Sequence, residues 1–182
     1  ATADFAAEQR TTFLLDHKIG VCDIVASAER EKIDASDLGM QHIKLRNLIG
    51  YLRDYKNVDT LLFTGGNSKN GPEYFFRKHL KVHDLKLKVV SNIVPRIHEF
   101  ELPDNGARST PDISGARLEK KIDDRIRIIK TVSLTAPSGA ANRAIGSMDS
   151  YKRMKDKNPE FNTLDFRVLQ YSQFFKMKLG HQ

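Results

Sequence analysis

The residues best suited to chemistry lie in residues 131–143 (TVSLTAPSGAANR), where an apolar strand pattern runs into a loop of small and polar residues. Small residues let a ligand approach the backbone closely, and Gly139 can adopt a positive φ angle at no steric cost. Ser138, Asn142 and Arg143 supply hydrogen-bond donors that suit phosphate oxygens or the edge of a base. The segment therefore predicts a loop that faces a polyanion, although an ordinary strand-to-helix turn can have the same composition.

A second group of polar residues lies in residues 63–69 (FTGGNSK), where paired glycines precede a predicted helix. Such glycines are typical of turns whose backbone N–H groups hold a phosphate. The segment lacks the spacing of a Walker loop and of a dinucleotide-binding fingerprint, which argues against an ATPase or a nicotinamide-dependent enzyme.

A carboxylate, Asp23, interrupts the apolar residues 19–25 (IGVCDIV). If this side chain is buried in a strand, it must receive hydrogen bonds or a charged partner. The alternative is that Asp23 caps a helix that begins in residues 26–32 (ASAEREK). The histidines offer no rival chemistry: His79 and His83 have the spacing of metal ligands but no third ligand nearby, so we expect no metal site.

Composition permits a nucleic-acid partner without requiring one. The chain has 182 residues, of which 40% are hydrophobic, so it can form one domain with a substantial core. Lys and Arg number 30 against 23 acidic residues, which gives a formal net charge of +7. One cysteine, Cys22, excludes an internal disulfide and makes a cysteine-based metal site implausible. With no signal-peptide pattern and no membrane-length apolar run, we expect a cytoplasmic protein that does not bind membranes.

Short apolar runs alternate with longer amphipathic ones, which is typical of a parallel sheet covered by helices. The predicted strands are residues 19–25, 60–63, 87–93 and 126–134. The predicted helices are residues 5–15, 40–55, 73–80, 147–155 and 163–178. We therefore expect a single domain over residues 1–182, with a three-layer α/β/α fold around a central, mainly parallel four-stranded sheet.

Two further features complete this prediction. The last predicted helix carries an apolar stripe that we expect in the core: Leu164, Val168, Tyr171, Phe174 and Phe175. The turn-rich residues 103–115 predict an exposed excursion. Because ligands bind at the carboxyl ends of strands in open parallel sheets, the three polar segments should meet at one edge.

Three segments in this order resemble the uracil-DNA glycosylase superfamily, and within it the deoxyinosine (hypoxanthine) and mismatch-specific branches. Residues 19–34 (IGVCDIVASAEREKID) are similar to the family's strand that carries a base-reading residue. Residues 60–69 (TLLFTGGNSK) are similar to its later strand and glycine turn, and residues 134–143 (LTAPSGAANR) to its DNA-inserting motif. Together the three segments span most of the chain.

This resemblance implies a DNA-repair glycosylase that hydrolyses the N-glycosidic bond of a deaminated or mismatched base flipped out of DNA. The substrate would be uracil, hypoxanthine or a similar base in damaged or mismatched duplex, and single strands could also serve. Asp23 and Cys22 would contact the base. The residues implied to contact DNA are Pro137, Ser138, Gly139, Ala140, Asn142, Arg143, Gly65 and Lys69. Neither a metal nor an organic cofactor is implied, and we expect a monomer.

The chain departs from the family pattern in three ways. The first family motif, which carries the water-positioning residue, should lie upstream of residue 19, where only eighteen residues stand. Ala136 occupies a position where many relatives have His or Asn, and the chain has no Trp. Catalytic residues therefore cannot be assigned, and either an N-terminal segment is missing or the motif has been lost. The alternative function is a catalytically silent module on the same fold that binds nucleic acid or nucleotides.

Overall fold

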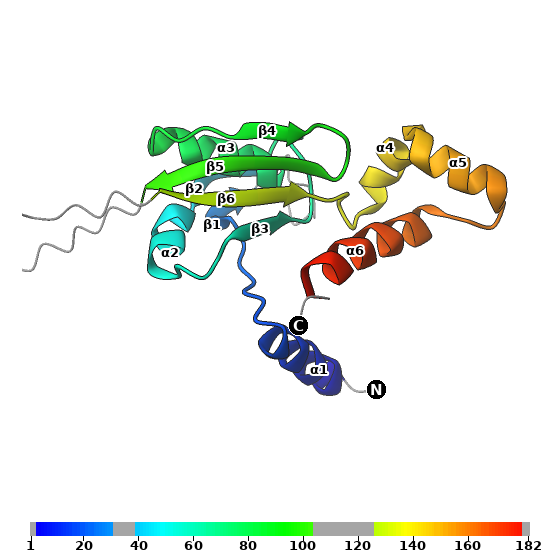
Figure 1. Ribbon diagram of the computed structural model, residues 1–182, viewed down its shortest axis with the longest axis horizontal. Coiled ribbons are helices and arrows are strands. Elements are labelled where there is room, and N and C mark those ends of the chain that lie inside the picture. The colour runs from blue at the N-terminus through cyan, green and yellow to red at the C-terminus, as the bar shows by residue number, and fades with distance from the viewer. Residues whose placement is uncertain (1–2, 31–38, 104–125, 180–182) are drawn as a thin grey trace, which may run out of the picture.

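A four-stranded sheet forms the centre of the structure, a computed structural model that describes residues 3–30, 39–103 and 126–179 (Figure 1). Its strand order is β3-β6-β5-β4, with β3 at Thr60–Phe63, β6 at Ile126–Ser133, β5 at Arg96–Pro103 and β4 at Lys88–Ser91. β3 and β6 are parallel, whereas β6 with β5 and β5 with β4 are antiparallel. The α/β class is confirmed, but the prediction of a mainly parallel sheet is wrong.

The missed strand β5 explains this error. Its side chains alternate, so that His98, Phe100 and Leu102 are buried, while Glu99 and Glu101 lie on the opposite side of the strand. Because charged residues separate the buried ones, β5 contains no continuous apolar run, and continuous runs were the pattern that predicted the other strands of this sheet. Because only a short connection separates β4 from β5, the two pair as antiparallel neighbours, and the chain direction is reversed before β6 begins.

A separate antiparallel hairpin replaces the predicted first strand and part of two predicted helices. β1 (Val25–Arg30) pairs with β2 (Met40–Leu45), and residues 19–23 form no strand. The alternative that Asp23 caps a helix in residues 26–32 is therefore excluded for the described part, and the predicted helix over residues 40–55 is correct only where α2 (Leu48–Asp54) forms.

Two helices and an aromatic cluster cover one face of the sheet. α3 (Pro72–Val82) places Phe76 against Phe63 of β3 and Phe100 of β5, with ring centroids 5.2 and 5.6 Å apart. Side chains of α2 and of the β1–β2 hairpin join the same core cluster. Burial of the apolar side chains in this cluster stabilises the fold.

The opposite face is covered at the carboxyl ends of β3 and β6 by α6 (Thr163–Leu179), where Phe174 packs with Val132 and Leu134 (Figure 1). Leu164 and Val168, near the start of α6, are 63% and 56% exposed, so the prediction that the whole apolar stripe is core is wrong for these two. Two short helices lead from β6 to α6: α4 (Asn142–Ser147) and α5 (Asp149–Lys157).

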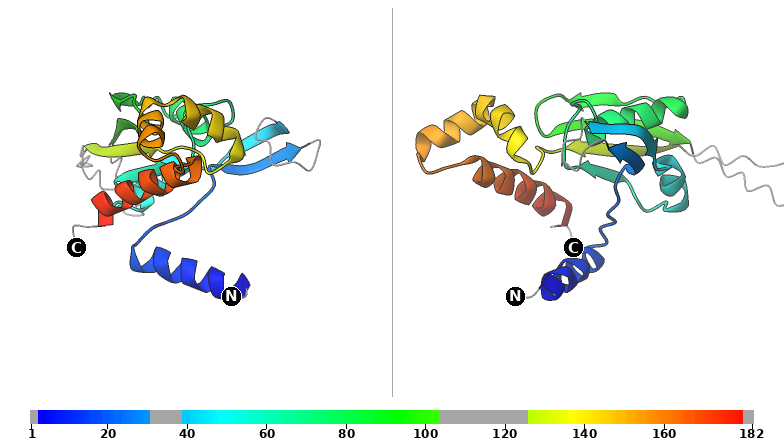
Figure 2. Two further views of the ribbon diagram at one scale, coloured as in Figure 1. Left: turned by 90° about the vertical axis from the view of Figure 1, so that its right-hand side faces the viewer. Right: turned by 180° about the vertical axis from the view of Figure 1, so that it is seen from behind.

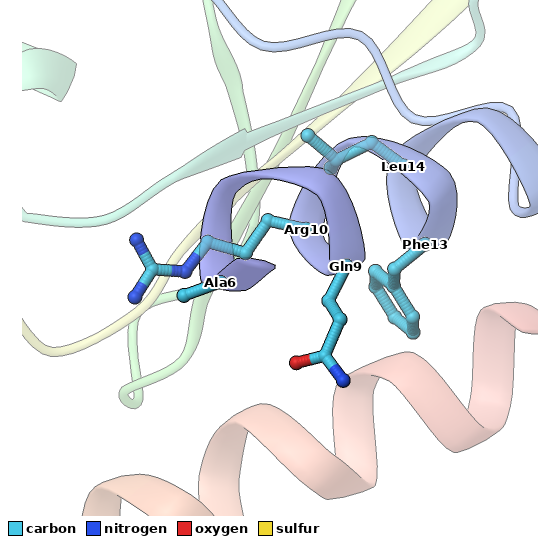
Figure 3. Close-up of a pocket in the computed structure, with 5 residues that line it drawn as sticks. All are labelled: Ala6, Gln9, Arg10, Phe13 and Leu14. Atoms are coloured by element: carbon cyan, nitrogen blue, oxygen red, sulfur yellow. The ribbon is translucent and has the colours of Figure 1, made fainter. Parts of the chain in front are cut away.

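The first helix, α1 (Ala3–Asp16), forms as predicted and stands apart from the sheet (Figures 1 and 2). A shallow hollow on its surface is lined by Ala6, Gln9, Arg10, Phe13 and Leu14, and Figure 3 shows Gln9 and Phe13 directed toward the side on which α6 runs. In the described part of the chain, no helix is both long and apolar enough to cross a membrane. Most of the predicted excursion, residues 104–115, lies outside the described residues.

Candidate nucleic-acid interface

The two predicted anion-binding loops lie side by side at one end of the parallel strand pair. We call residues 64–71 the glycine loop and residues 135–143, which include the first two residues of α4, the Pro-Ser-Gly loop. The two together are the strand-end surface. β3 and β6 pair in register up to Phe63 and Ser133, so both loops leave the sheet at the same edge. The glycine loop approaches the Pro-Ser-Gly loop at Gly65, where a Cβ atom would be 3.0 Å from the Pro72 ring and 3.8 Å from the Ala136 side chain.

The glycine loop closes tightly on itself. A Cβ atom at Gly71 would lie only 2.4 Å from the Gly66 carbonyl oxygen, so no larger residue fits there without moving the loop. The Gly71 N–H donates to the Ser68 carbonyl, and Asn70 between them has a φ of 62°. These are the features of a turn with a left-handed third residue. Lys69 lies at the exposed tip of this turn.

The Pro-Ser-Gly loop is exposed on its outer side and held from behind by Arg167 of α6. Pro137, Ser138, Gly139, Ala140, Asn142 and Arg143 are all exposed. The Arg167 Nε donates to the Ala136 carbonyl at 2.9 Å, and its Nη2 donates to the Ser138 carbonyl at 2.7 Å and to Asn142 Oδ1 at 2.6 Å. One planar guanidinium thus fixes three points of the loop.

Two more side chains of α6 hold the start of this loop. The backbone N–H and the hydroxyl of Thr135 both donate to Gln170 Oε1, at 2.9 and 2.8 Å, and the Tyr171 hydroxyl donates to the Thr135 carbonyl at 3.0 Å. Gln170 and Thr135 are buried, and burial raises the pKa of Tyr171, which keeps its proton available for this bond. The Pro-Ser-Gly loop is therefore preorganised by α6.

A buried ion cluster lies beneath the two loops. The side chain of Glu73, in the first turn of α3, is 1% exposed. Its Oε1 accepts two hydrogen bonds from Arg77, at 2.9 and 2.8 Å, while its Oε2 accepts from Arg96 at 2.6 Å and from Ser133 at 2.8 Å. A Cβ atom on Gly66 would lie 2.8 Å from the same Arg96 guanidinium. The cluster therefore connects α3, β5, β6 and the glycine loop.

Glu73 has a structural role and does not act as a base. Burial by itself raises the pKa of this carboxyl, but hydrogen bonds from Ser133 and Arg77 and the positive charge of Arg96 outweigh burial and leave the pKa below its ordinary value. Each oxygen already accepts two hydrogen bonds, so no lone pair is left to remove a proton from water. His98 accepts a hydrogen bond from Arg77 at its Nε2, and burial lowers its pKa, which keeps the ring neutral.

The structure places Asp23 and Cys22 away from this surface. Both are exposed and lie in the segment that leads from α1 into β1, which Figures 1 and 2 show apart from the carboxyl ends of β3 and β6. The carboxylate of Asp23 accepts from the Val25 N–H at 3.0 Å and so precedes a strand rather than a helix. The expectation that all three polar segments meet is wrong for this one.

Several residues of the site were missed from the sequence, although a signal for some was present. Arg167, Gln170 and Tyr171 have the spacing i, i+3, i+4, which places three polar groups on one side of an otherwise amphipathic helix. Glu73 and Arg77 have the i, i+4 spacing of an ion pair. No sequence pattern could have shown that Arg96 joins them, because β5 itself was missed.

The described residues contain no group of three or more His, Cys, Asp or Glu side chains that could hold a metal ion. His79 accepts a hydrogen bond from the Ile49 N–H at 3.3 Å and packs against His83, a core role that explains the pair.

No protein-family model, curated protein or solved structure matches this chain. Its function must therefore be inferred from the strand-end surface.

Proposed function

We propose that this protein binds DNA through the strand-end surface, at a deaminated or mismatched base that is flipped out of the helix. The observation that carries the proposal is the Pro-Ser-Gly loop, whose outer side is exposed while its inner side is fixed by Arg167. A loop held in this way presents small residues and donors to a ligand without first paying the entropy of ordering them.

Charge supports the same partner. Arg143 and Lys69 are exposed on the two loops, Arg96 is 27% exposed beneath them, and neither loop contains an acidic residue. Arginine and lysine side chains bind backbone phosphates, and this term makes affinity depend on salt. Extruding a base costs a few kcal/mol, least at a damaged or mismatched pair, which would give the surface a preference for lesions.

Hydrolysis of the glycosidic bond is the second candidate function, and the resemblance of residues 134–143 to a DNA-inserting motif favours it. The reaction needs donors for the charge that develops on the leaving base and a group that positions water. Ser138 and Asn142 can supply donors. Neither loop supplies a carboxylate, and Glu73 already accepts four hydrogen bonds, so the group that positions water would have to come from outside the strand-end surface.

The test uses labelled duplexes that carry uracil, hypoxanthine, xanthine, a G:T mismatch or no lesion. We expect tighter binding to at least one lesion than to the intact duplex, with affinity falling as salt rises. Arg143→Ala should weaken binding and reduce the salt slope by about one unit. Lys81→Ala, an exposed change in the last turn of α3, is the matched control and should leave the slope unchanged.

Treatment of the same mixtures with alkali separates the two functions. Strand scission at one lesion would establish base excision and identify the base. Binding without scission would leave a DNA-binding module. If the protein binds all duplexes equally and independently of salt, or binds none of them, the strand-end surface is not a DNA-binding surface.

A further inference from the structure

We propose that Arg167 is a positioning residue that makes the Asn142 amide a hydrogen-bond donor only, so that the strand-end surface selects an acceptor oxygen at this point. The inference rests on the proposed function and names what one of its residues recognises. The acceptor is an oxygen of either a backbone phosphate or a base carbonyl.

The orientation of the Asn142 amide follows from its neighbours. The Arg167 Nη2 donates to Oδ1 at 2.6 Å, and the Thr163 hydroxyl lies 3.1 Å from the same oxygen. Because a guanidinium has donors and no acceptor, the amide atom that faces it must be the oxygen rather than the nitrogen. The end of the side chain that remains is the NH2 group.

This NH2 group is available to a ligand. Asn142 is exposed, and within residues 3–30, 39–103 and 126–179 its Nδ2 makes no hydrogen bond. An amide that rotated freely could offer either its oxygen or its nitrogen to a partner. With the oxygen held by two donors, the side chain offers two N–H donors and no acceptor.

A donor-only amide has a consequence for base choice. Deamination replaces an exocyclic amino group, which donates, with a carbonyl oxygen, which accepts. At a base edge, Asn142 would therefore favour the deaminated base over its parent. At a phosphate, it would contribute affinity without this preference.

The variant Asn142→Asp separates the two ends of the amide. Aspartate keeps an oxygen for Arg167 and Thr163 but replaces the NH2 group with a second oxygen. We expect affinity for lesion duplex to fall by about tenfold or more. Hydrogen exchange of residues 136–143 in the free protein should stay as slow as in the wild type. Asn67→Asp makes the same charge change at an exposed position of the glycine loop and should cost clearly less.

The variant Arg167→Lys tests the positioning role. Lysine keeps the positive charge but cannot donate to three loop atoms from one plane. We expect exchange of residues 136–143 to accelerate and affinity to fall several-fold, with the salt slope unchanged. Arg10→Lys, the same change at an exposed position of α1, is the matched control and should preserve both affinity and exchange.

A duplex with a tetrahydrofuran residue in place of the lesion nucleoside distinguishes the two sources of the oxygen. If Asn142→Asp costs as much on this duplex as on the lesion duplex, the acceptor is a phosphate. If the cost disappears, the acceptor is a base carbonyl.

Three results would overturn the inference. Unchanged affinity in Asn142→Asp would exclude a donor role. If Asn142→Asp lowers affinity no more than Asn67→Asp does, the added negative charge alone explains the loss and the donor role is excluded as well. Unchanged exchange in Arg167→Lys would exclude the positioning role. If the wild-type protein binds none of the duplexes, both the proposed function and the proposed contact of Asn142 with DNA are refuted. The exchange measurement still decides whether Arg167 fixes the loop.

Discussion

Replacing Glu73 with Gln should destabilise the protein strongly, because this one carboxylate accepts four hydrogen bonds. Glutamine keeps one acceptor oxygen and places an amide nitrogen where the other oxygen was. Either the two bonds from Arg77 or those from Arg96 and Ser133 are then lost, and the guanidinium groups lose their counter-charge.

The magnitude follows from burial. Removing one partner of a fully buried ion pair costs about 3–5 kcal/mol, and a hydrogen bond to a charged group contributes about 1.5–3 kcal/mol. The side chains of Arg77 and Arg96 are 33% and 27% exposed, so water recovers part of this loss. We therefore expect the free energy of unfolding to fall by about 2–4 kcal/mol, which lowers Tm by roughly 6–12 °C at the midpoint of that range.

Urea denaturation at pH 7 measures this loss, with Glu101→Gln on the exposed side of β5 as the control, for which we expect a change within about 0.5 kcal/mol. Since the folded pKa of Glu73 lies below its ordinary value of 4.5, the stability that its charge provides is fully present above pH 4.5 and is lost as the pH falls through the folded pKa. The gap between wild type and Glu73→Gln should therefore be constant above pH 4.5 and narrow below it. A loss under about 1 kcal/mol at pH 7, or a gap that does not narrow in acid, would refute the argument.

Three further predictions follow from the packing. Gly71→Ala should cost about 1–3 kcal/mol because its Cβ would meet the Gly66 carbonyl oxygen at 2.4 Å, whereas Gly139→Ala, with nothing within 4 Å, should cost much less; paired denaturation curves compare them. Phe76→Ala should cost about 3–5 kcal/mol by opening a cavity between β3 and β5, and a loss under 1 kcal/mol would show that the core collapses around it. Burial lowers the folded pKa of His98 below its ordinary value of 6.5. The neutral ring therefore contributes stability at pH values above 6.5, and this contribution is lost as the pH falls below 6.5 toward the folded pKa. His98→Gln should make the free energy of unfolding depend less on pH between pH 7 and 5 than it does in the wild type, which denaturation curves at the two pH values measure.

The sequence predicted the elements whose apolar residues are continuous or helical in period. β3, β4, β6, α1, α3 and α6 all form close to their expected bounds. The two loops at the ends of β3 and β6 were placed together correctly, because the carboxyl ends of parallel neighbours share an edge.

The failures have physical causes that a local pattern does not contain. β5 alternates buried and charged residues, and β1 has a composition, VASAER, that favours a helix by propensity but pairs with β2 instead. The position of Asp23 depends on tertiary packing, which placed it outside any strand. The hydrogen bonds of Arg167 join residues about 30 positions apart, and no spacing rule reaches that far.

The parallel pairing of β3 with β6 has a consequence for how binding can be detected. The two loops belong to parts of the chain that come together only when these distant strands pair, so a ligand that spans both loops binds the folded chain and not the unfolded one. Such a ligand raises the unfolding free energy of the whole protein by mass action, by about 2.7 kcal/mol at one hundred times its Kd. The melting temperature of the unlabelled protein is therefore a reporter for every oligonucleotide in a screen, with no catalytic turnover required.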